Sequence, residues 1–137
     1  MVISDRDEIR HLLTVYNNCG DRGAIDEMVS VFTPDCILEI PDRRFEGRDD
    51  AAAFFKSVAT QKDGDVDLRG ARHNLTTSRI DFDSDTTASG WTYFFVTRRG
   101  QTIEEGVYID KYRKTADGWR ISQRRVKIIF SEFLPDL

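Results

Sequence analysis

The sequence contains few of the residues that bind metals or form disulfides. Among its 137 residues it has two histidines and two cysteines, Cys19 and Cys36. The cysteines have no metal-type spacing, and two histidines are too few to complete a zinc site. One disulfide would also be a thin framework for a secreted domain of this size. We therefore expect no bound metal and a reduced, cytoplasmic protein.

Long hydrophobic runs and basic stretches are also missing. The first residues, MVISDRDEIRH, lack the apolar segment of a signal peptide. No later run approaches the roughly 18 apolar residues of a membrane helix. Charged residues make up 32% of the chain, both signs are interspersed, and the formal net charge is −4. This distribution provides no positive field for nucleic acid or an anionic membrane, so we expect neither as a partner.

The chain does contain enough apolar material for one core. Hydrophobic residues make up 39% of the sequence and aromatic residues 11%, with nine phenylalanines. The length is close to the commonest domain size. Because no repeat, low-complexity segment or linker divides the sequence, we predict a single domain over residues 1–137.

The first half of the chain has helical periodicity. Ser4 with Asp7 three residues later predicts a capped helix start. The apolar stripe of this helix follows at helical spacing, with Ile9, Leu12, Leu13 and Tyr16. A second, shorter helix is predicted to run from about Ile25 to Phe32, where Thr33, Pro34 and Asp35 stop it. A short strand over 36–40, a second around 44–45, a third helix from Asp49 or Asp50 and an exposed loop over 61–67 complete this half.

From Gly70 onward the apolar period changes from 3.6 to 2. Four stretches rich in β-branched and aromatic residues cover 71–82, 86–98, 104–115 and 119–130, and turn signals separate them. Strands this long coil, and helices that precede a sheet in sequence are typical of an α+β fold. We predict three N-terminal helices packed on a strongly curved antiparallel sheet, forming a cone-shaped barrel with an internal apolar pocket.

The order of these elements, together with four local patterns, carries a resemblance to a known family. The patterns are Tyr16-x4-Asp21 followed by Met28-x3-Phe32-x2-Asp35, Arg72-His73, Gly106-x-Tyr108-x-Asp110-Lys111-Tyr112, and Gly118-Trp119-Arg120-Ile121. The chain resembles the nuclear transport factor two-like (cystatin-like) superfamily over nearly its whole length. Within it, the chain looks like the SnoaL-like branch, which includes scytalone dehydratase and the bile-acid 7α-dehydratases. The resemblance implies a pocket and acid–base chemistry without a cofactor.

Three residues form the candidate catalytic set. His73 is the side chain best suited to exchange protons near neutral pH, although a half-buried structural histidine would fit the sequence as well. Asp21 is positioned to cap the second helix, whereas the resemblance implies that it pairs with His73 and stabilises the charged imidazole. Tyr16 buries its ring in either case, and its hydroxyl is a candidate donor to a substrate carbonyl.

Five further residues are candidates for contacting substrate. Tyr108 and Asp110 share one face of the third long strand, and Trp91 and Tyr93 share one face of the second. Phe55 lies on the apolar side of the third helix. Alternation leaves open which face lines the concave side, and sheet packing or a subunit interface explains these aromatics equally well. An aromatic lining suits a small apolar or aromatic molecule as the partner.

The sequence departs from both dehydratases it resembles. Bile-acid dehydratases carry a further acid in the second long strand, and residues 91–95 contain none. Scytalone dehydratase uses a second histidine in its sheet, whereas His11 lies on the first helix and is expected to face solvent. The last strand contains three arginines. One of them would pair with Asp110 or with a substrate carboxylate if it faces inward, but a solvent-exposed strand face explains all three as well. They are Arg120, Arg124 and Arg125.

These observations favour a cofactor-independent lyase or isomerase of the dehydratase type. It would act on a small apolar, aromatic or polycyclic carbonyl or hydroxy compound by proton transfer through His73. The alternatives are a polyketide cyclase and a non-catalytic ligand-binding or scaffold domain, like the small subunit of aromatic-ring-hydroxylating dioxygenases. The apolar last strand and the residues after it predict a homodimer or homotrimer, because such a surface is rarely left in water. Its residues are Ile128, Ile129, Phe130 and Phe133.

Overall fold

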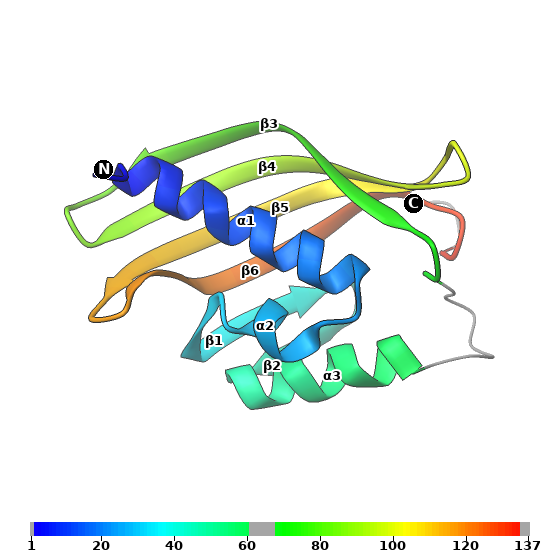
Figure 1. Ribbon diagram of the computed structural model, residues 1–137, viewed down its shortest axis with the longest axis horizontal. Helices are drawn as coiled ribbons and strands as arrows, with labels where there is room; N and C mark the ends of the chain where they lie inside the picture. Colours follow the sequence, from blue (N-terminus) through cyan, green and yellow to red (C-terminus); the bar gives the residue numbers. More distant parts are fainter. Residues whose placement is uncertain (1, 61–67, 135–137) are drawn as a thin grey trace.

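The computed structural model describes residues 2–60 and 68–134, which form three helices and a six-stranded sheet (Figure 1). The helices are α1 (Asp5–Asp21), α2 (Ile25–Val29) and α3 (Arg48–Thr60). The strands are β1 (Phe32–Ile40), β2 (Arg43–Glu46), β3 (Arg72–Phe82), β4 (Thr87–Arg98), β5 (Gln101–Thr115) and β6 (Gly118–Ser131). The loop predicted over 61–67 lies outside the described residues. No helix in the described part of the chain is long and apolar enough to cross a membrane.

Helix α1 begins and packs as its sequence predicts. The Ser4 hydroxyl accepts a hydrogen bond from the Asp7 backbone N–H at 3.1 Å, which satisfies one free donor of the first turn. The predicted apolar stripe from Ile9 to Tyr16 is buried, and His11 is exposed. The helix therefore presents one face to the sheet, and its last residue, Asp21, lies at the edge of that contact.

Strand β1 begins earlier than the sequence indicates. Phe32 and Thr33 were expected to end the second helix, but they begin β1, and α2 ends at Val29. The reason is tertiary, because Phe32 pairs in parallel with Ile121 of β6. Pro34 is accommodated where the register shifts between Phe32 and Ile37, a position that does not require its missing N–H.

The four long strands form the predicted antiparallel meander. Their order in the sheet is β2-β1-β6-β5-β4-β3, and the pairing of β1 with β6 is the parallel one. Predicted and observed strand ends differ by at most three residues. The period-2 pattern therefore located every long strand.

The sheet curves but does not close into the predicted barrel. Its edge strands, β2 and β3, stand at opposite ends of the sheet order. Strand β2 has four residues, which is too short to carry a seam of hydrogen bonds to β3. Helix α1 contacts both β3 and β6 and so covers the concave side, while α3 packs on β1 and β2 (Figure 1).

Two glycines allow aromatic rings to lie flat on the inner face of the sheet. A Cβ atom at Gly106 would lie 2.8 Å from the ring of Phe94, its partner on β4. A Cβ atom at Gly90 would lie 2.8 Å from the ring of Tyr112. The inner face can therefore hold a continuous layer of rings, which continues from Phe94 to Tyr108.

Candidate functional site

Asp21 and His73 form a hydrogen-bonded pair between the end of α1 and the start of β3. Asp21 Oδ1 lies 2.7 Å from His73 Nδ1, and Asp21 Oδ2 accepts the His73 backbone N–H at 2.9 Å. Both oxygens are thus committed to His73, and α2 has no side-chain cap. Because a carboxylate accepts hydrogen bonds, the pairing favours the tautomer with the proton on Nδ1. Nε2 is then left as a basic lone pair.

The pair is sheltered but still reachable. The His73 side chain is 23% exposed and that of Asp21 11%. The Phe94 ring lies beside the imidazole, with ring centroids 6.3 Å apart. A histidine fixed at one nitrogen and open at the other has the geometry of a general base.

A second charged cluster lies deeper in the core, between Asp110 and Arg124. Arg124 Nε and Nη2 donate to the two carboxylate oxygens of Asp110, each at 2.8 Å, and the Tyr112 hydroxyl donates to Oδ2 at 2.9 Å. Both side chains of the ion pair are 0% exposed. Burial by itself would lower the pKa of Arg124, but the Asp110 carboxylate reverses that effect and raises the pKa above its ordinary value. The predicted inward-facing partner of Asp110 is therefore Arg124.

Two tyrosines enclose the Arg124 guanidinium. Its central carbon lies 4.3 Å from the ring centre of Tyr16 and 4.0 Å from that of Tyr108, which are cation–π distances. Burial raises the pKa of the Tyr16 hydroxyl, and the Arg124 charge opposes this. The phenol is therefore a neutral hydrogen-bond donor at physiological pH. Tyr16 also packs edge-on against Phe55, with centroids 5.9 Å apart.

Two buried donors in this cluster lack a partner among the described residues, Arg124 Nη1 and Asn17 Nδ2. Asn17 uses its oxygen to accept the Tyr108 hydroxyl at 3.0 Å. Buried polar groups are nearly always hydrogen-bonded, so an orphan donor points to a water or a ligand oxygen. Nothing in the sequence marks Asn17 as part of a site.

The predicted site residues therefore fall into two groups. Asp21 and His73 meet at one edge, while Tyr16, Tyr108, Asp110 and Phe55 surround Arg124. Between the groups lies a ring stack, in which Phe94 lies beside His73 and stacks on Tyr108 with centroids 4.4 Å apart. The space expected to be an apolar pocket is thus occupied by aromatic side chains.

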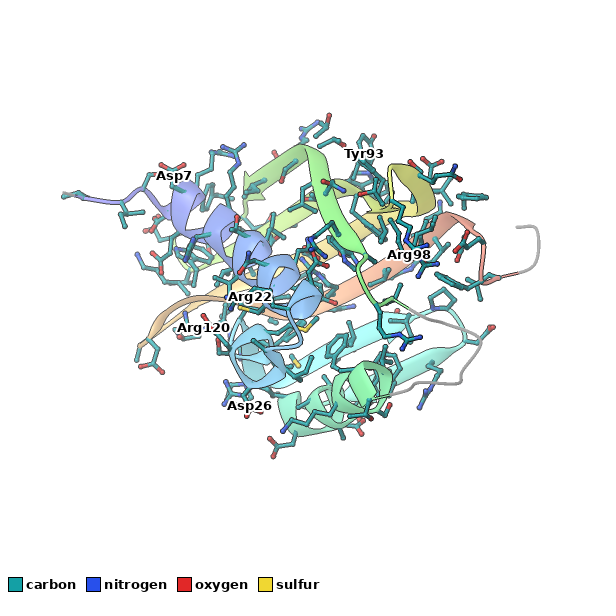
Figure 2. All side chains as sticks on the ribbon, turned by 45° about the vertical axis from the view of Figure 1, so that its right-hand side comes forward. Asp7, Arg22, Asp26, Tyr93, Arg98 and Arg120 are labelled. Atoms are coloured by element: carbon teal, nitrogen blue, oxygen red, sulfur yellow. The ribbon has the colours of Figure 1, made fainter. Side chains whose placement is uncertain are left out.

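Trp91 and Tyr93 belong to neither group. They are 44% and 47% exposed, while Thr92 and Phe94, which alternate with them, are buried. They therefore lie on the outer face of β4, and their predicted place in a pocket lining is corrected. Figure 2 shows Tyr93 near the rim of the molecule, away from Arg22 at the end of α1. Alternation predicted that Trp91 and Tyr93 share one face of the strand, but it did not predict which face of the sheet that is.

One surface depression, of about 460 Å³, lies between α2 and α3. His73 and Asp21 are not part of it. It is lined mainly by polar side chains and small aliphatic ones, and its Asp26–Lys56 contact is an exposed ion pair at 2.9 Å. We therefore locate the candidate site by the chemistry of the Asp21–His73 pair. The lining residues are Asp26, Val29, Ser30, Arg48, Asp49, Ala52, Ala53 and Lys56.

Glu104 is an inner-face residue that the sequence reasoning did not single out. It has the same parity as Tyr108 and Asp110 on β5, so the alternation that grouped those two also includes it. The predicted strand begins at this residue, whereas β5 begins at Gln101, so Glu104 lies inside the strand and not at its end.

The SnoaL-like domain model matches residues 1–125. This chain belongs to the SnoaL-like family. An uncharacterized protein of Mycobacterium tuberculosis is 33% identical to this SnoaL-like protein over 127 residues, covering 89% of this chain and 84% of the relative.

Solved structures share the fold at lower identity. One is a cystatin-like protein of unknown function from Nostoc punctiforme, with a TM-score of 0.79, 20% identity, and coverage of 93% of this chain and 95% of that chain. Another is a candidate scytalone dehydratase from Novosphingobium aromaticivorans, with a TM-score of 0.73, 22% identity, and coverage of 88% and 80%. The SnoaL-like branch predicted from the sequence is confirmed, and the solved structures share the predicted cystatin-like fold.

Proposed function

We propose that this SnoaL-like protein is a cofactor-independent lyase or isomerase acting on a neutral, apolar carbonyl or hydroxy compound. The observation that supports this most directly is the Asp21–His73 pair, which fixes Nδ1 of the imidazole while Nε2 has no hydrogen bond to the described residues. The fold shared with a candidate scytalone dehydratase agrees with chemistry of this class. Free, buried Cys19 and Cys36 agree with the cytoplasmic location that we propose.

In the proposed reaction, His73 Nε2 removes a proton from the carbon next to the substrate carbonyl. The electron pair of the broken C–H bond moves toward the carbonyl oxygen, which gives an enolate. The Asp21 carboxylate stabilises the imidazolium that forms and keeps the ring in place. A positioned base of this kind typically contributes about 10²–10⁴-fold to the rate.

We assign a second polar group of the substrate, remote from the enolate, to the Tyr16 hydroxyl and to Arg124 Nη1 and Asn17 Nδ2, two donors that have no partner among the described residues. These donors lie across the Phe94–Tyr108 stack from His73. A substrate that reaches both groups must extend past two aromatic rings and displace or follow them. The assignment therefore favours a polycyclic compound over a single ring.

The test measures deuterium exchange of the α-protons of 2-tetralone and a steroid 3-ketone in D₂O by NMR. Wild-type protein should exchange them faster than buffer, and His73→Gln should lower the enzymatic rate at least about 100-fold. His11→Gln is the matched control, since His11 is exposed on α1. An unchanged rate in His73→Gln, or no wild-type exchange above buffer, would contradict the proposal.

The outer face of the sheet supports a second candidate function, assembly. Trp91, Tyr93, Ile129 and Phe130 are 44%, 47%, 50% and 46% exposed. The first two share this face with Ile109 and Val107, their partners on β5. Exposed apolar patches of this kind mark protein interfaces, and we propose that this one forms a homodimer or homotrimer.

Sedimentation of the wild-type protein and the Trp91→Ser/Tyr93→Ser double variant tests this assembly. The wild type should sediment as an oligomer at micromolar concentration, and the double variant should shift to monomer. The variant should keep its α-proton exchange, because neither side chain faces His73. A wild-type monomer would rule out self-association. Loss of exchange in a monomeric variant would show that assembly completes the site.

A further inference from the structure

Glu104 lies in the same row of the inner face as His73. Glu104 of β5 pairs with Val96 of β4, and Val96 pairs with His73 of β3. Directly paired residues point to the same face, and two strand spacings separate the outer members by about 10 Å at Cα. Val96 is fully buried and short, so the two longer side chains flank it. The row thus places one titratable side chain on either side of Val96.

One oxygen of Glu104 is held by β6. The Ser131 hydroxyl donates to Glu104 Oε2 at 3.0 Å, and it accepts the Phe133 backbone N–H at 3.2 Å. Ser131 is buried and stands opposite Glu104 in the β5–β6 register. Oε1 takes no hydrogen bond from the part of the chain that the structure describes. The Ser131 hydrogen bond therefore orients the carboxyl group through Oε2 and leaves Oε1 available to a substrate. His73 is similar, because Asp21 binds its Nδ1 and leaves Nε2 available.

We propose that Glu104 is the general acid of the site, donating its proton to the leaving hydroxyl while His73 accepts the carbon-bound proton. The inference rests on the proposed function and assigns the reaction as a dehydration of a β-hydroxy ketone. His73 Nε2 takes the α-proton, the C–H electron pair becomes the new C=C bond, and the C–O bond breaks. The oxygen leaves as water with the Glu104 proton. Proton transfer from imidazolium to carboxylate through solvent then restores both groups.

The surroundings of Glu104 agree with a proton-donating role. Burial raises the pKa of its carboxyl, which the Ser131 hydrogen bond and the charge of His73 oppose. Among the described residues, the titratable group that acts on Glu104 is His73 on β3, which Asp21 from α1 holds.

The experiment compares two substrates that share a skeleton and differ in leaving group. The first is 4-hydroxy-4-(2-naphthyl)butan-2-one, whose hydroxyl must be protonated to leave. The second is its 4-nitrophenyl ether, whose nitrophenolate leaves without a proton. Glu104→Gln should lower the rate on the hydroxy ketone about 100-fold and that on the ether less than about threefold. His73→Gln should lower both, and Glu105→Gln, an exposed neighbour on the outer face, should lower neither.

A second variant tests the same role while keeping the acid. Ser131→Ala removes the hydrogen bond that lowers the pKa of Glu104, so that pKa should rise. Because a general acid must be protonated, activity on the hydroxy ketone falls as pH rises through the Glu104 pKa. Ser131→Ala should therefore move this alkaline limb to higher pH without lowering the maximal rate. The Ser131→Ala variant also tests the role of Glu104 if Glu104→Gln does not fold.

The outcomes separate this inference from the proposed function. Equal losses on both substrates in Glu104→Gln would mean that Glu104 acts through His73 or the fold, and would overturn the inference. An unchanged rate on the hydroxy ketone, or an unmoved alkaline limb in Ser131→Ala, would also overturn it. If His73→Gln retains full activity on both substrates, or if the wild type converts neither, the proposed function itself fails.

Discussion

Asp21 and Asp110 each bind a basic residue through both carboxylate oxygens, on opposite sides of the Phe94–Tyr108 ring stack, but one of the two bonds of Asp21 is to the His73 backbone N–H. The Asp110–Arg124 pair is completely buried, and Tyr112 supplies a further donor to the carboxylate. The Asp21–His73 pair is partly exposed and leaves Nε2 unbonded among the described residues.

Under the proposed function, this difference separates a structural pair from one that transfers protons. Arginine stays protonated at any physiological pH, so the Asp110–Arg124 pair cannot exchange protons with a substrate. Its Nη1 group can only donate a hydrogen bond. Histidine changes charge near neutral pH, and partial exposure gives a substrate access to it. We therefore expect changes near Asp110 to alter folding, and changes near Asp21 to alter turnover.

The largest expected effect is on stability. Asp110→Ala leaves the guanidinium of Arg124 buried without its counter-charge, and breaking a buried pair in this way costs about 3–5 kcal/mol. Urea denaturation should show this loss in the free energy of unfolding. His73→Gln, which removes a partly exposed group, should cost under about 1 kcal/mol in the same measurement.

A triple variant distinguishes the loss of charge pairing from the loss of volume. Asp110→Leu, Arg124→Met and Tyr112→Phe together replace the cluster with apolar groups of similar size. Because no buried charge is then left unpaired, this protein should be more stable than Asp110→Ala. A triple variant that is less stable than the single one would show that the ion pair itself contributes net stability.

The fold was largely predictable because periodicity reports which residues face a common side. The period-2 pattern located β3 to β6, and the 3.6 period located α1. The start of β1 was not predictable, because Phe32 is drawn into the sheet by Ile121 of β6, a residue far away in sequence. Barrel closure was also beyond local patterns, since it depends on how far the four-residue strand β2 lies from β3.

The candidate site was predictable only in part. The pairing of Asp21 with His73, 52 residues apart, was expected from family resemblance and not from spacing. Alternation grouped Trp91 with Tyr93 but assigned no side, because the two faces of a strand are equivalent until packing distinguishes them. Asn17 belongs to the site because it accepts a hydrogen bond from the Tyr108 hydroxyl. This contact joins α1 to β5, and no local sequence pattern predicts it.

A smaller effect is expected from Asp21→Asn, and it tests the reactive pair directly. If the amide oxygen keeps the backbone N–H of His73, the amide NH₂ group faces Nδ1 and donates to it. The imidazole must then carry its proton on Nε2, where it blocks the base. We expect about a 100-fold loss of α-proton exchange, equivalent to about 2.7 kcal/mol in the barrier, with little change in stability.

Nitrogen-15 NMR should show the tautomer change at His73. The control variant is Asp26→Asn, which changes an exposed residue on α2 and should show neither effect. Full exchange activity with the proton on Nε2 would mean that the Nε2 lone pair is not the base, and the contrast between the two aspartate pairs would no longer account for function.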